Sequence, residues 1–178
     1  KGRPVLLLKV HFPKKVNGKY ITPSIDVYKD FLAQIRSYRG LFCVFMPHPK
    51  FYEQLEKLEG LRSVRKFKDV LDQSENVIEC ADDDYRPTLM AADFHIVDRS
   101  ALLIEAGVTG KPVLYVEAQS EEKMTLPVER ILSSYYRAKD ARGIFKFIEE
   151  VVMMDVDPRK EERLIAISDE IPARRERS

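Results

Sequence analysis

The chain has 178 residues, of which 30 are Lys or Arg and 29 are Asp or Glu. This length fits one domain with a substantial core, and the balanced charge gives no support to a general nucleic-acid binder. No apolar run approaches the roughly 20 residues that span a bilayer, and the amino terminus has no signal-peptide pattern.

The first half of the chain alternates between strand and helix patterns. Residues 5–10 form an apolar run of strand length, and the segment from 11 to 24, rich in Pro and Lys, predicts a long loop. Ser24 can cap a helix over residues 25–38, and residues 41–46 predict a second buried strand. A short helix is expected next, over residues 51–58, while residues 61–74 have no clear pattern. The third strand is expected at residues 77–80.

The second half continues the alternation. Asp84 can cap a helix that runs to Ala91, and a strand, a helix and another strand are expected in the ranges 94–97, 101–108 and 112–116. Gly110 occupies the expected C-cap of that helix. Further helices are expected over 128–135, 141–153 and 158–167. This order predicts an α/β fold, a Rossmann-like parallel sheet with helices on both faces.

Residues 1–168 are expected to form a single domain, and residues 169–178 a short, frayed basic tail. Because the chain begins with Lys1 rather than Met, we interpret it as an excised domain or processed fragment, which leaves room for a missing half of the active site. The Gly-rich fingerprint of dinucleotide-binding enzymes and the phosphate-binding loop of P-loop NTPases are both absent from the sequence.

The two cysteines, Cys43 and Cys80, lie in apolar segments and are interpreted as reduced, buried thiols. Together with the missing signal peptide they favour a cytoplasmic protein. No Cys or His pair has metal-site spacing, so no metal site is expected. The acidic run from Asp82 to Asp84 is interpreted as a solvated helix cap rather than a metal site.

The strongest functional signal is Asp98-Arg99-Ser100, which directly follows the expected strand at 94–97 and precedes a helix. Ligands bind at the carboxyl ends of parallel strands, and a hydroxyl, a guanidinium and helix amides there suit a phosphate. A plain N-cap explains Asp98 and Ser100 equally well. Glu105, mid-helix among apolar residues, either faces solvent or holds a ligand hydroxyl.

Two histidines are expected at the same edge of the sheet. His48 lies between two prolines after the second strand, and His11 follows the first strand. An imidazole there can contact a phosphate as a cation or act as an acid or base, and His48 is our candidate for a catalytic residue. Lys14 and Lys15 could add positive charge to this crevice, although lysines in loops are usually only solvated. His95 alternates within a strand and is interpreted as a core histidine.

The segment from Asp98 to Glu105, followed by Gly110-Lys111-Pro112-Val113, resembles the donor-binding half of GT-B glycosyltransferase-like enzymes, and the CDP-glycerol glycerophosphotransferase family of teichoic acid and capsule polymerases in particular. That family has a T-D-Y-S-S pattern, an acidic residue four positions later, a G-K-P-V segment and a His-Pro pair like His48-Pro49. This sequence departs from the pattern because Arg99 replaces Tyr and Ala101 replaces the second Ser.

The resemblance implies that His48, Asp98 and Ser100 contact the donor phosphates, with Arg99 beside them, and that Glu105 holds a ribose or glycerol hydroxyl. It implies no cofactor and no metal ion. The expected function is transfer of glycerol-phosphate, a polyol phosphate or a sugar from a nucleotide donor to a polysaccharide or teichoic-acid-like acceptor, in the cytoplasm or at the inner membrane face. An N-terminal half would supply the acceptor site. The alternatives are a UDP-sugar 2-epimerase-like enzyme and a non-catalytic GT-B-like binding or assembly module.

Overall fold

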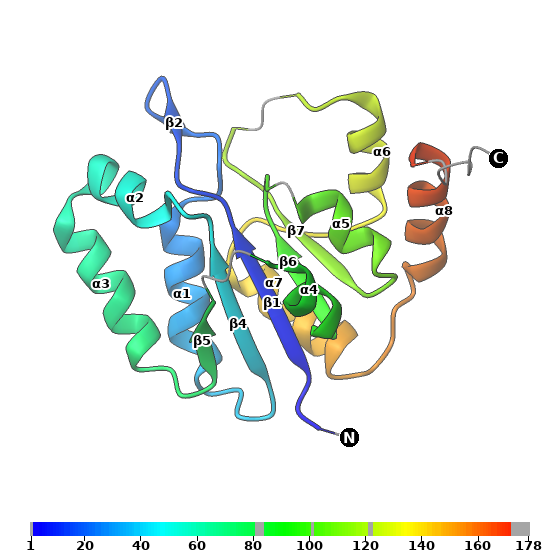
Figure 1. Cartoon of the computed structure of the whole chain (residues 1–178), viewed down its shortest axis with the longest axis horizontal. Coiled ribbons are helices and arrows are strands. Elements are labelled where there is room, and N and C mark those ends of the chain that lie inside the picture. The colour runs from blue at the N-terminus through cyan, green and yellow to red at the C-terminus, as the bar shows by residue number, and fades with distance from the viewer. Residues whose placement is uncertain (1, 81–83, 101, 121–122, 172–178) are drawn as a thin grey trace.

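The computed structural model describes residues 2–80, 84–100, 102–120 and 123–171, and it has a parallel six-stranded sheet between two layers of helices (Figure 1). The strand order is β5-β4-β1-β6-β7-β8, and every pairing in this sheet is parallel. The strands are β1 Val5–Val10, β4 Phe42–Pro47, β5 Val77–Glu79, β6 Phe94–Val97, β7 Val113–Val116 and β8 Tyr136–Ala138. The predicted fold class is therefore confirmed.

The helices divide between the two faces of the sheet (Figure 1). One face packs against α1 Ile25–Ile35, α2 Phe51–Glu59, α3 Leu61–Asp72, α7 Ala141–Phe147 and the π-helical turn η1 Ile148–Val152. The other packs against α4 Arg86–Ala91, α5 Leu102–Val108, α6 Leu126–Ser133 and α8 Lys160–Glu170. The central strands are covered on both faces, which is why they are continuous apolar runs rather than alternating ones.

The central strand β1 shows how side chains are shared between the layers. Leu6, Leu8 and Val10 point to the α1 side, and Leu7 points to the α4 and α5 side. Because successive strand residues alternate between faces, Lys9 is directed to the same face as Leu7. This places a charged side chain among the elements of the α5 layer.

Several element boundaries differ from the sequence-based expectations. Residues 61–72, which had no clear pattern, form α3, and the helix expected at 128–135 begins earlier and gives way to β8. β8 escaped prediction because it has only three residues and its middle residue, Arg137, is exposed, as expected for an edge strand. Ser24 does occupy the N-cap of α1, but its side chain makes no capping hydrogen bond.

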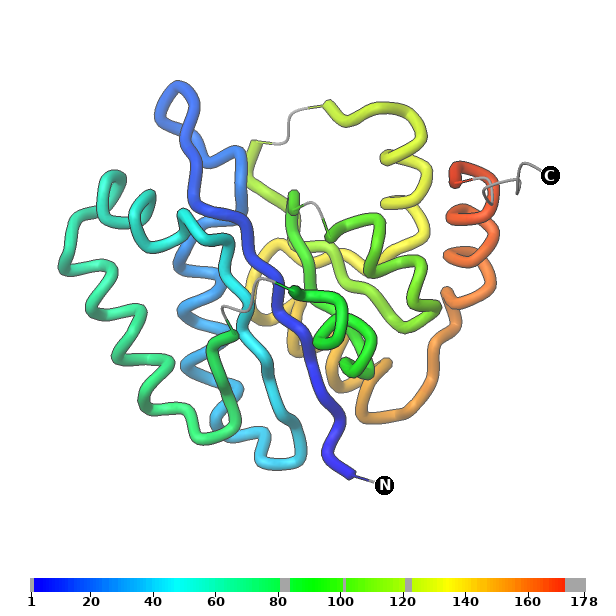
Figure 2. The backbone as a smooth tube through the Cα atoms, viewed as in Figure 1, coloured from blue at the N-terminus to red at the C-terminus, as the bar shows by residue number. Residues whose placement is uncertain are grey.

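The expected loop after β1 contains a small antiparallel hairpin, β2 Lys15–Val16 and β3 Lys19–Tyr20. It turns at Asn17 and Gly18, which both have positive φ and suit a two-residue hairpin loop. Figure 2 shows this hairpin projecting past the carboxyl end of β1. The loop therefore rises beside the edge of the sheet where the predicted site lies.

The ends of α4 and α8 bear on two other expectations. The N-cap of α4 is Tyr85 and not Asp84 as expected, although Asp84 accepts a hydrogen bond from the Arg86 amide (3.2 Å). Asp82 and Asp83 lie outside the described residues. Asp169 and Glu170 belong to α8, and residues 172–178 of the expected basic tail are also outside them. Within the described parts of the chain, no helix is long and apolar enough to cross a bilayer.

Candidate functional site

The sheet has its switch point between β1 and β6. From β1 the chain proceeds outward through β4 and β5 on one side, and from β6 through β7 and β8 on the other. The loops that leave β1 and β6 therefore diverge, and in α/β sheets this divergence opens the crevice in which ligands bind. His11 follows β1, Asp98 follows β6 and His48 follows β4. The expectation that these residues share one edge of a parallel sheet is confirmed.

Asp98 is the buried anchor of this edge. Its side chain is 1% exposed, and both carboxylate oxygens accept a hydrogen bond from the His11 amide, each at 3.0 Å. The Tyr28 hydroxyl of α1 donates to Oδ2 at 2.7 Å. Burial raises the pKa of Asp98 to about 6, although the hydrogen bonds from Tyr28 and the His11 amide favour the ionised form.

This geometry gives Asp98 an internal role. A carboxylate that is buried and already accepts these hydrogen bonds holds the ends of β1 and β6 together, and its negative charge would repel a phosphate. We therefore treat Asp98 as a positioning residue rather than as a direct phosphate contact. The sequence could not reveal this, because the partner groups lie 70 and 87 residues away.

The rings of the two histidines lie next to each other, tilted by 45°, at this edge of the sheet. The ring centroids of His11 and His48 are 5.2 Å apart, and the Phe12 ring packs edge-on against His48 at 4.9 Å. His48 Nδ1 accepts a hydrogen bond from the Lys50 amide (3.1 Å), so the neutral ring carries its proton on Nε2. Burial, and then the positive charges of His11, Lys9 and Lys50, lower the pKa of His48. A bound anion would reverse the effect of these charges.

The turn after β6 supplies the other polar groups. The Ser100 amide donates to the Asp98 carbonyl (2.7 Å), but Ser100 Oγ is buried and has no partner among the described residues. A buried hydroxyl without a partner costs free energy, which a ligand oxygen could restore. Arg99 is half-buried and already interacts with another residue. Glu105 on α5 is half-buried and accepts a hydrogen bond from the Tyr85 hydroxyl at 2.9 Å.

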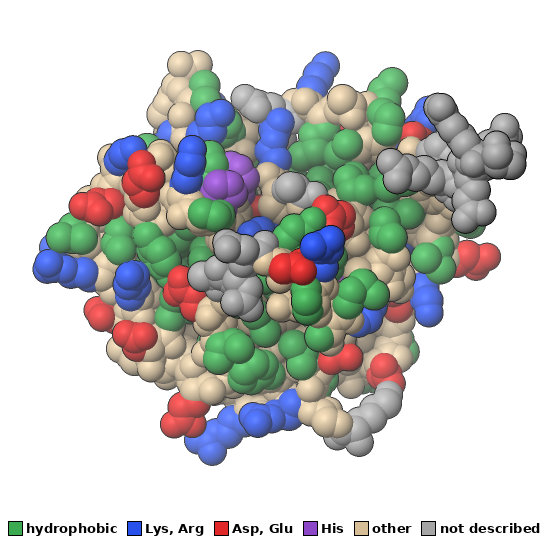
Figure 3. All heavy atoms as spheres, in the orientation of Figure 1, with side chains coloured by type: hydrophobic (Ala, Val, Ile, Leu, Met, Phe, Trp, Pro, Cys, Tyr) green, Lys and Arg blue, Asp and Glu red, His purple; other side chains and the backbone are tan. Residues whose placement is uncertain are grey.

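Lys14 and Lys15 are exposed on the hairpin side of the loop. The Lys14 amide donates to Thr22 Oγ1 (3.0 Å), and the Lys15 amine lies 4.3 Å from the centroid of the Tyr20 ring. Among the described residues, no contact joins either lysine to His48. Figure 3 shows histidine and basic side chains close together on this face of the molecule.

The predicted core histidine is confirmed. His95 is completely buried, and its Nε2 lies 3.2 Å from Thr109 Oγ1, whose own proton goes to the Ala106 carbonyl at 2.6 Å. Nε2 therefore carries the hydrogen, and Nδ1 is left without a partner in the described structure. Both cysteines are free thiols, as expected, and Cys43 is buried. The expectation that Cys80 is buried was wrong, because it follows the end of edge strand β5 and is half-buried.

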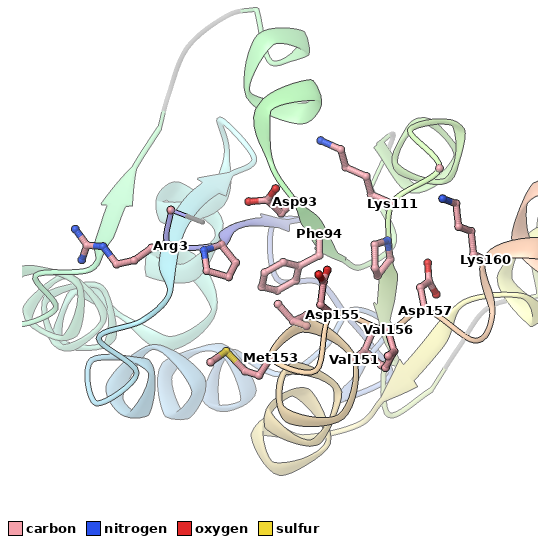
Figure 4. A pocket seen from close by; sticks show the side chains of 15 residues that line it. Arg3, Asp93, Phe94, Lys111, Val151, Met153, Asp155, Val156, Asp157 and Lys160 are labelled. Carbon is pink, nitrogen blue, oxygen red and sulfur yellow. The ribbon is translucent and has the colours of Figure 1, made fainter.

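A separate cleft of about 810 Å³ lies at the opposite, amino-terminal edge of the sheet (Figure 4). It is lined by residues that include Arg3, Asp93, Lys111 and Asp157. Three of these already have partners: Asp93 accepts from the Val5 amide (2.7 Å), Lys111 donates to the Met90 and Ala92 carbonyls, and Asp157 pairs with Arg163. None of the site residues predicted from the sequence lines this cleft. No group of three or more potential metal ligands occurs in the described residues.

No protein-family model and no curated protein sequence match the chain. Solved structures do match. The C-terminal CMP-Kdo binding domain of WaaA from Acinetobacter baumannii is 13% identical with a TM-score of 0.60, and the match covers 97% of this chain and 91% of that one. UDP-GlcNAc 2-epimerase from Neisseria meningitidis bound to UDP-GlcNAc is 16% identical with a TM-score of 0.55, covering 93% and 39%.

The E. coli heptosyltransferase WaaC with ADP is 11% identical with a TM-score of 0.52, covering 85% of this chain and 45% of that chain. The chain thus spans nearly all of one isolated domain but less than half of these two larger enzymes. Identities this low establish the fold and not the activity. The chain has the Rossmann-like fold found in the C-terminal domains of GT-B glycosyltransferases.

Proposed function

We propose that this domain binds a nucleotide-activated donor and forms the donor half of a transferase that moves glycerol-phosphate, a polyol phosphate or a sugar. The observation that carries this proposal is the group of polar side chains at the switch point of the sheet, where the His11 and His48 rings lie 5.2 Å apart and Ser100 Oγ is buried without a partner in the described structure. Two imidazoles and a hydroxyl that lacks a partner suit the diphosphate of such a donor.

In the proposed chemistry, an acceptor hydroxyl attacks the donor and the nucleotide leaves with its phosphate charge stabilised by His48, Ser100 and Arg99. Asp98 holds the His11 amide and thereby the shape of the crevice. Glu105 is placed to hold a ribose or glycerol hydroxyl, and the Tyr85 hydroxyl bound to it fixes its orientation. The proposal uses protein cations and needs no metal ion or cofactor.

The donor that we propose first is CDP-glycerol, on the basis of the Asp98-to-Glu105 segment and its Gly-Lys-Pro-Val continuation. The acceptor would be a polysaccharide or teichoic-acid-like chain, and a second half of the enzyme would supply its binding site. The location would be the cytoplasm, at or near the inner face of the membrane. An epimerase acting on a UDP-sugar is the second candidate, because its solved structures share this fold.

A third possibility is a non-catalytic assembly module. It is favoured by Arg99, which replaces the tyrosine of the pattern and already interacts with another residue in the structure. The assembly-module hypothesis predicts that the domain has the same fold but no affinity for nucleotides.

Calorimetric titration with CDP-glycerol, CMP, UDP and UDP-sugars separates these candidates. Saturable binding of the cytidine ligands supports the glycerophosphotransferase reading, whereas preference for uridine favours a sugar transferase or epimerase, which product analysis on a two-domain enzyme would then distinguish. Absence of binding by all of these ligands would contradict the proposal and favour the assembly module.

Site variants test the residue roles. We expect Ser100→Ala and His48→Gln each to weaken binding of the preferred nucleotide about tenfold, the typical value of a hydrogen bond to a charged group. The matched control is Ser168→Ala, because that hydroxyl only bonds to its own helix. Wild-type affinity should also rise as pH falls through the lowered pKa of His48, and His48→Gln should remove this rise. Unchanged affinity in both site variants would contradict the assigned roles.

A further inference from the structure

Lys9 is the one charged residue in the central strand β1. It pairs in register with Met46 of β4 on one side and Val97 of β6 on the other. All other residues of this strand are apolar, so a lysine here requires a physical reason.

Lys9 is the penultimate residue of β1, so its side chain leaves the strand close to the carboxyl edge of the sheet at the switch point. Its charge acts on Asp98 at the end of β6, on Cys80 at the end of β5 and on His48 after β4. These three groups follow strands on both sides of β1, so the charge of Lys9 acts on both sides of the switch point. The side chain is half-buried, and within the described residues no hydrogen bond or ion pair joins its amine to a partner.

A partly desolvated ammonium without a hydrogen-bonded partner is unfavourable in the unliganded protein. Asp98 attracts it but does not form an ion pair with it, because the Asp98 carboxylate is taken up by the His11 amide and the Tyr28 hydroxyl. Ser100 follows three residues after Val97, the register partner of Lys9 in β6, and its hydroxyl lacks a partner in the described structure. A cation and a hydroxyl donor that both lack partners point to an anion that would satisfy them together.

We propose that Lys9 is an anion-binding residue of the candidate site and contacts the phosphate groups of a bound nucleoside diphosphate. This inference rests on the proposed function and adds a further positive charge to the candidate site. Burial is the largest cause of the lowered pKa of Lys9, with Asp98 and Cys80 acting in the opposite direction. A phosphate beside the amine would raise that pKa again, so ligand binding and protonation of Lys9 support each other.

The consequence is a characteristic pH dependence. As pH rises through the lowered pKa of Lys9, the amine loses its charge and affinity for an anion should fall. His48 is already neutral in this alkaline range because its pKa is lowered from 6.5. His11, Asp98 and Cys80 also follow strands at this edge, and the comparison with Lys9→Met separates the effect of Lys9 from theirs. A decline of affinity on the alkaline side therefore reports Lys9 and not the histidine.

The test uses CDP, whose charge is constant across most of the range, titrated into the whole chain from about pH 7.5 up to about pH 10.5, the ordinary pKa of a lysine. We expect Lys9→Met to weaken CDP binding at least about tenfold at the lower pH and to abolish the alkaline decline seen in the wild type. The matched control is Lys146→Met, which removes an exposed charge on α7 and should behave like the wild type.

The outcomes separate the two proposals. If Lys9→Met binds CDP within about twofold of the wild type, the inference is overturned while nucleotide binding stands. If that variant does not fold, the wild-type titration decides, since an affinity that does not change with alkaline pH overturns the role of Lys9. If the wild type binds neither CDP nor any other nucleotide, the proposed function and this inference fail together.

Discussion

At the scale of single residues, hydrogen bonding distinguishes two kinds of side chain at the carboxyl edge of the sheet: those that position other groups and those that are available to bind a ligand. Asp98 is buried and has its oxygens satisfied from within, whereas the Ser100 hydroxyl is buried and has no partner in the described residues. Buried polar groups are normally paired, so an exception is informative. The difference between these two neighbours indicates which of them a ligand would contact.

His95 gives a prediction about pH and stability. Burial, followed by the charges of Lys111 and Arg163, lowers the pKa of His95 to about 4. His95 therefore binds a proton near pH 6.5 in the unfolded chain but only near pH 4 in the folded chain. Because the unfolded chain binds more protons between these values, the contribution of His95 to stability is lost as pH falls through this window.

We expect His95→Phe to flatten the dependence of unfolding free energy on pH between about 6.5 and 4, as measured by urea unfolding. The comparison with the wild type isolates His95 from Asp98, whose raised pKa makes an opposite contribution: stability falls as pH rises towards about 6. An equally steep decline in the variant and the wild type would show that His95 is not responsible.

At the scale of elements, the α5 layer is held by close packing against the segments around it. Gly107 of α5 lies against the Tyr135 ring and Ile167 of α8, and the Tyr135 hydroxyl donates to the Leu103 carbonyl at 2.7 Å. α5 is the helix that follows Ser100, so this packing also determines where Glu105 lies. A glycine is required there for space rather than for its backbone angles.

We expect Gly107→Ala to destabilise the domain by about 3 kcal/mol, because the added methyl group would overlap the Tyr135 hydroxyl and lie 2.7 Å from Ile167 Cδ1. Tyr135→Phe in the same background should recover part of this loss, and a double-mutant cycle measured by chemical unfolding would give the coupling. Gly40→Ala is the control, since nothing lies within 4 Å of the added atom. Equal losses for the two alanine variants would refute the packing argument.

At the scale of the whole molecule, a buried ion pair closes the carboxyl-terminal part of the fold onto the sheet. Arg163 of α8 is fully buried and pairs with Asp157, which also accepts a hydrogen bond from the Tyr136 hydroxyl of β8 at 2.9 Å. Arg163 Nε has no partner among the described residues. Through Asp157, the pair connects the last helix, α8, to the edge strand, β8. This edge strand is separated from the switch point by β6 and β7.

We expect Asp157→Asn to cost about 3–5 kcal/mol in unfolding free energy, because it leaves the guanidinium charge buried without a counter-ion. Replacing both residues, as Asp157→Asn with Arg163→Met, should recover much of this loss. Glu162→Gln removes a carboxylate that is paired at the surface with Arg159 and should change stability by less than about 1 kcal/mol. A loss for Asp157→Asn as small as this control would show that the pair contributes little.

The sequence determined the architecture and the edge of the sheet at which the candidate site residues lie. Strands such as Val5–Val10 and Phe94–Val97 are continuous apolar runs because both faces of the sheet are covered, and that pattern is local. Since parallel strands end at one edge, chain order alone predicted that His48 and the turn at Asp98 share a crevice. The segment Leu61–Asp72 and the edge strand at Tyr136 could not be assigned, because their patterns are weak and packing decides their conformation.

Only the tertiary structure decided which polar side chains are hydrogen-bonded within the protein and which are available to a ligand. Asp98 turns inward because the Tyr28 hydroxyl and the His11 amide, both distant in sequence, meet its oxygens, and nothing near Asp98 in the chain indicates this. In the sequence, Lys9 only interrupts an apolar run. Its charge acts on His48, Cys80 and Asp98 only because folding brings the ends of β4, β5 and β6 next to β1. The hydrophobic pattern that predicts a strand or helix depends on residues that are neighbours in the sequence. The protonation and hydrogen bonding of a side chain depend on partners that only folding brings together.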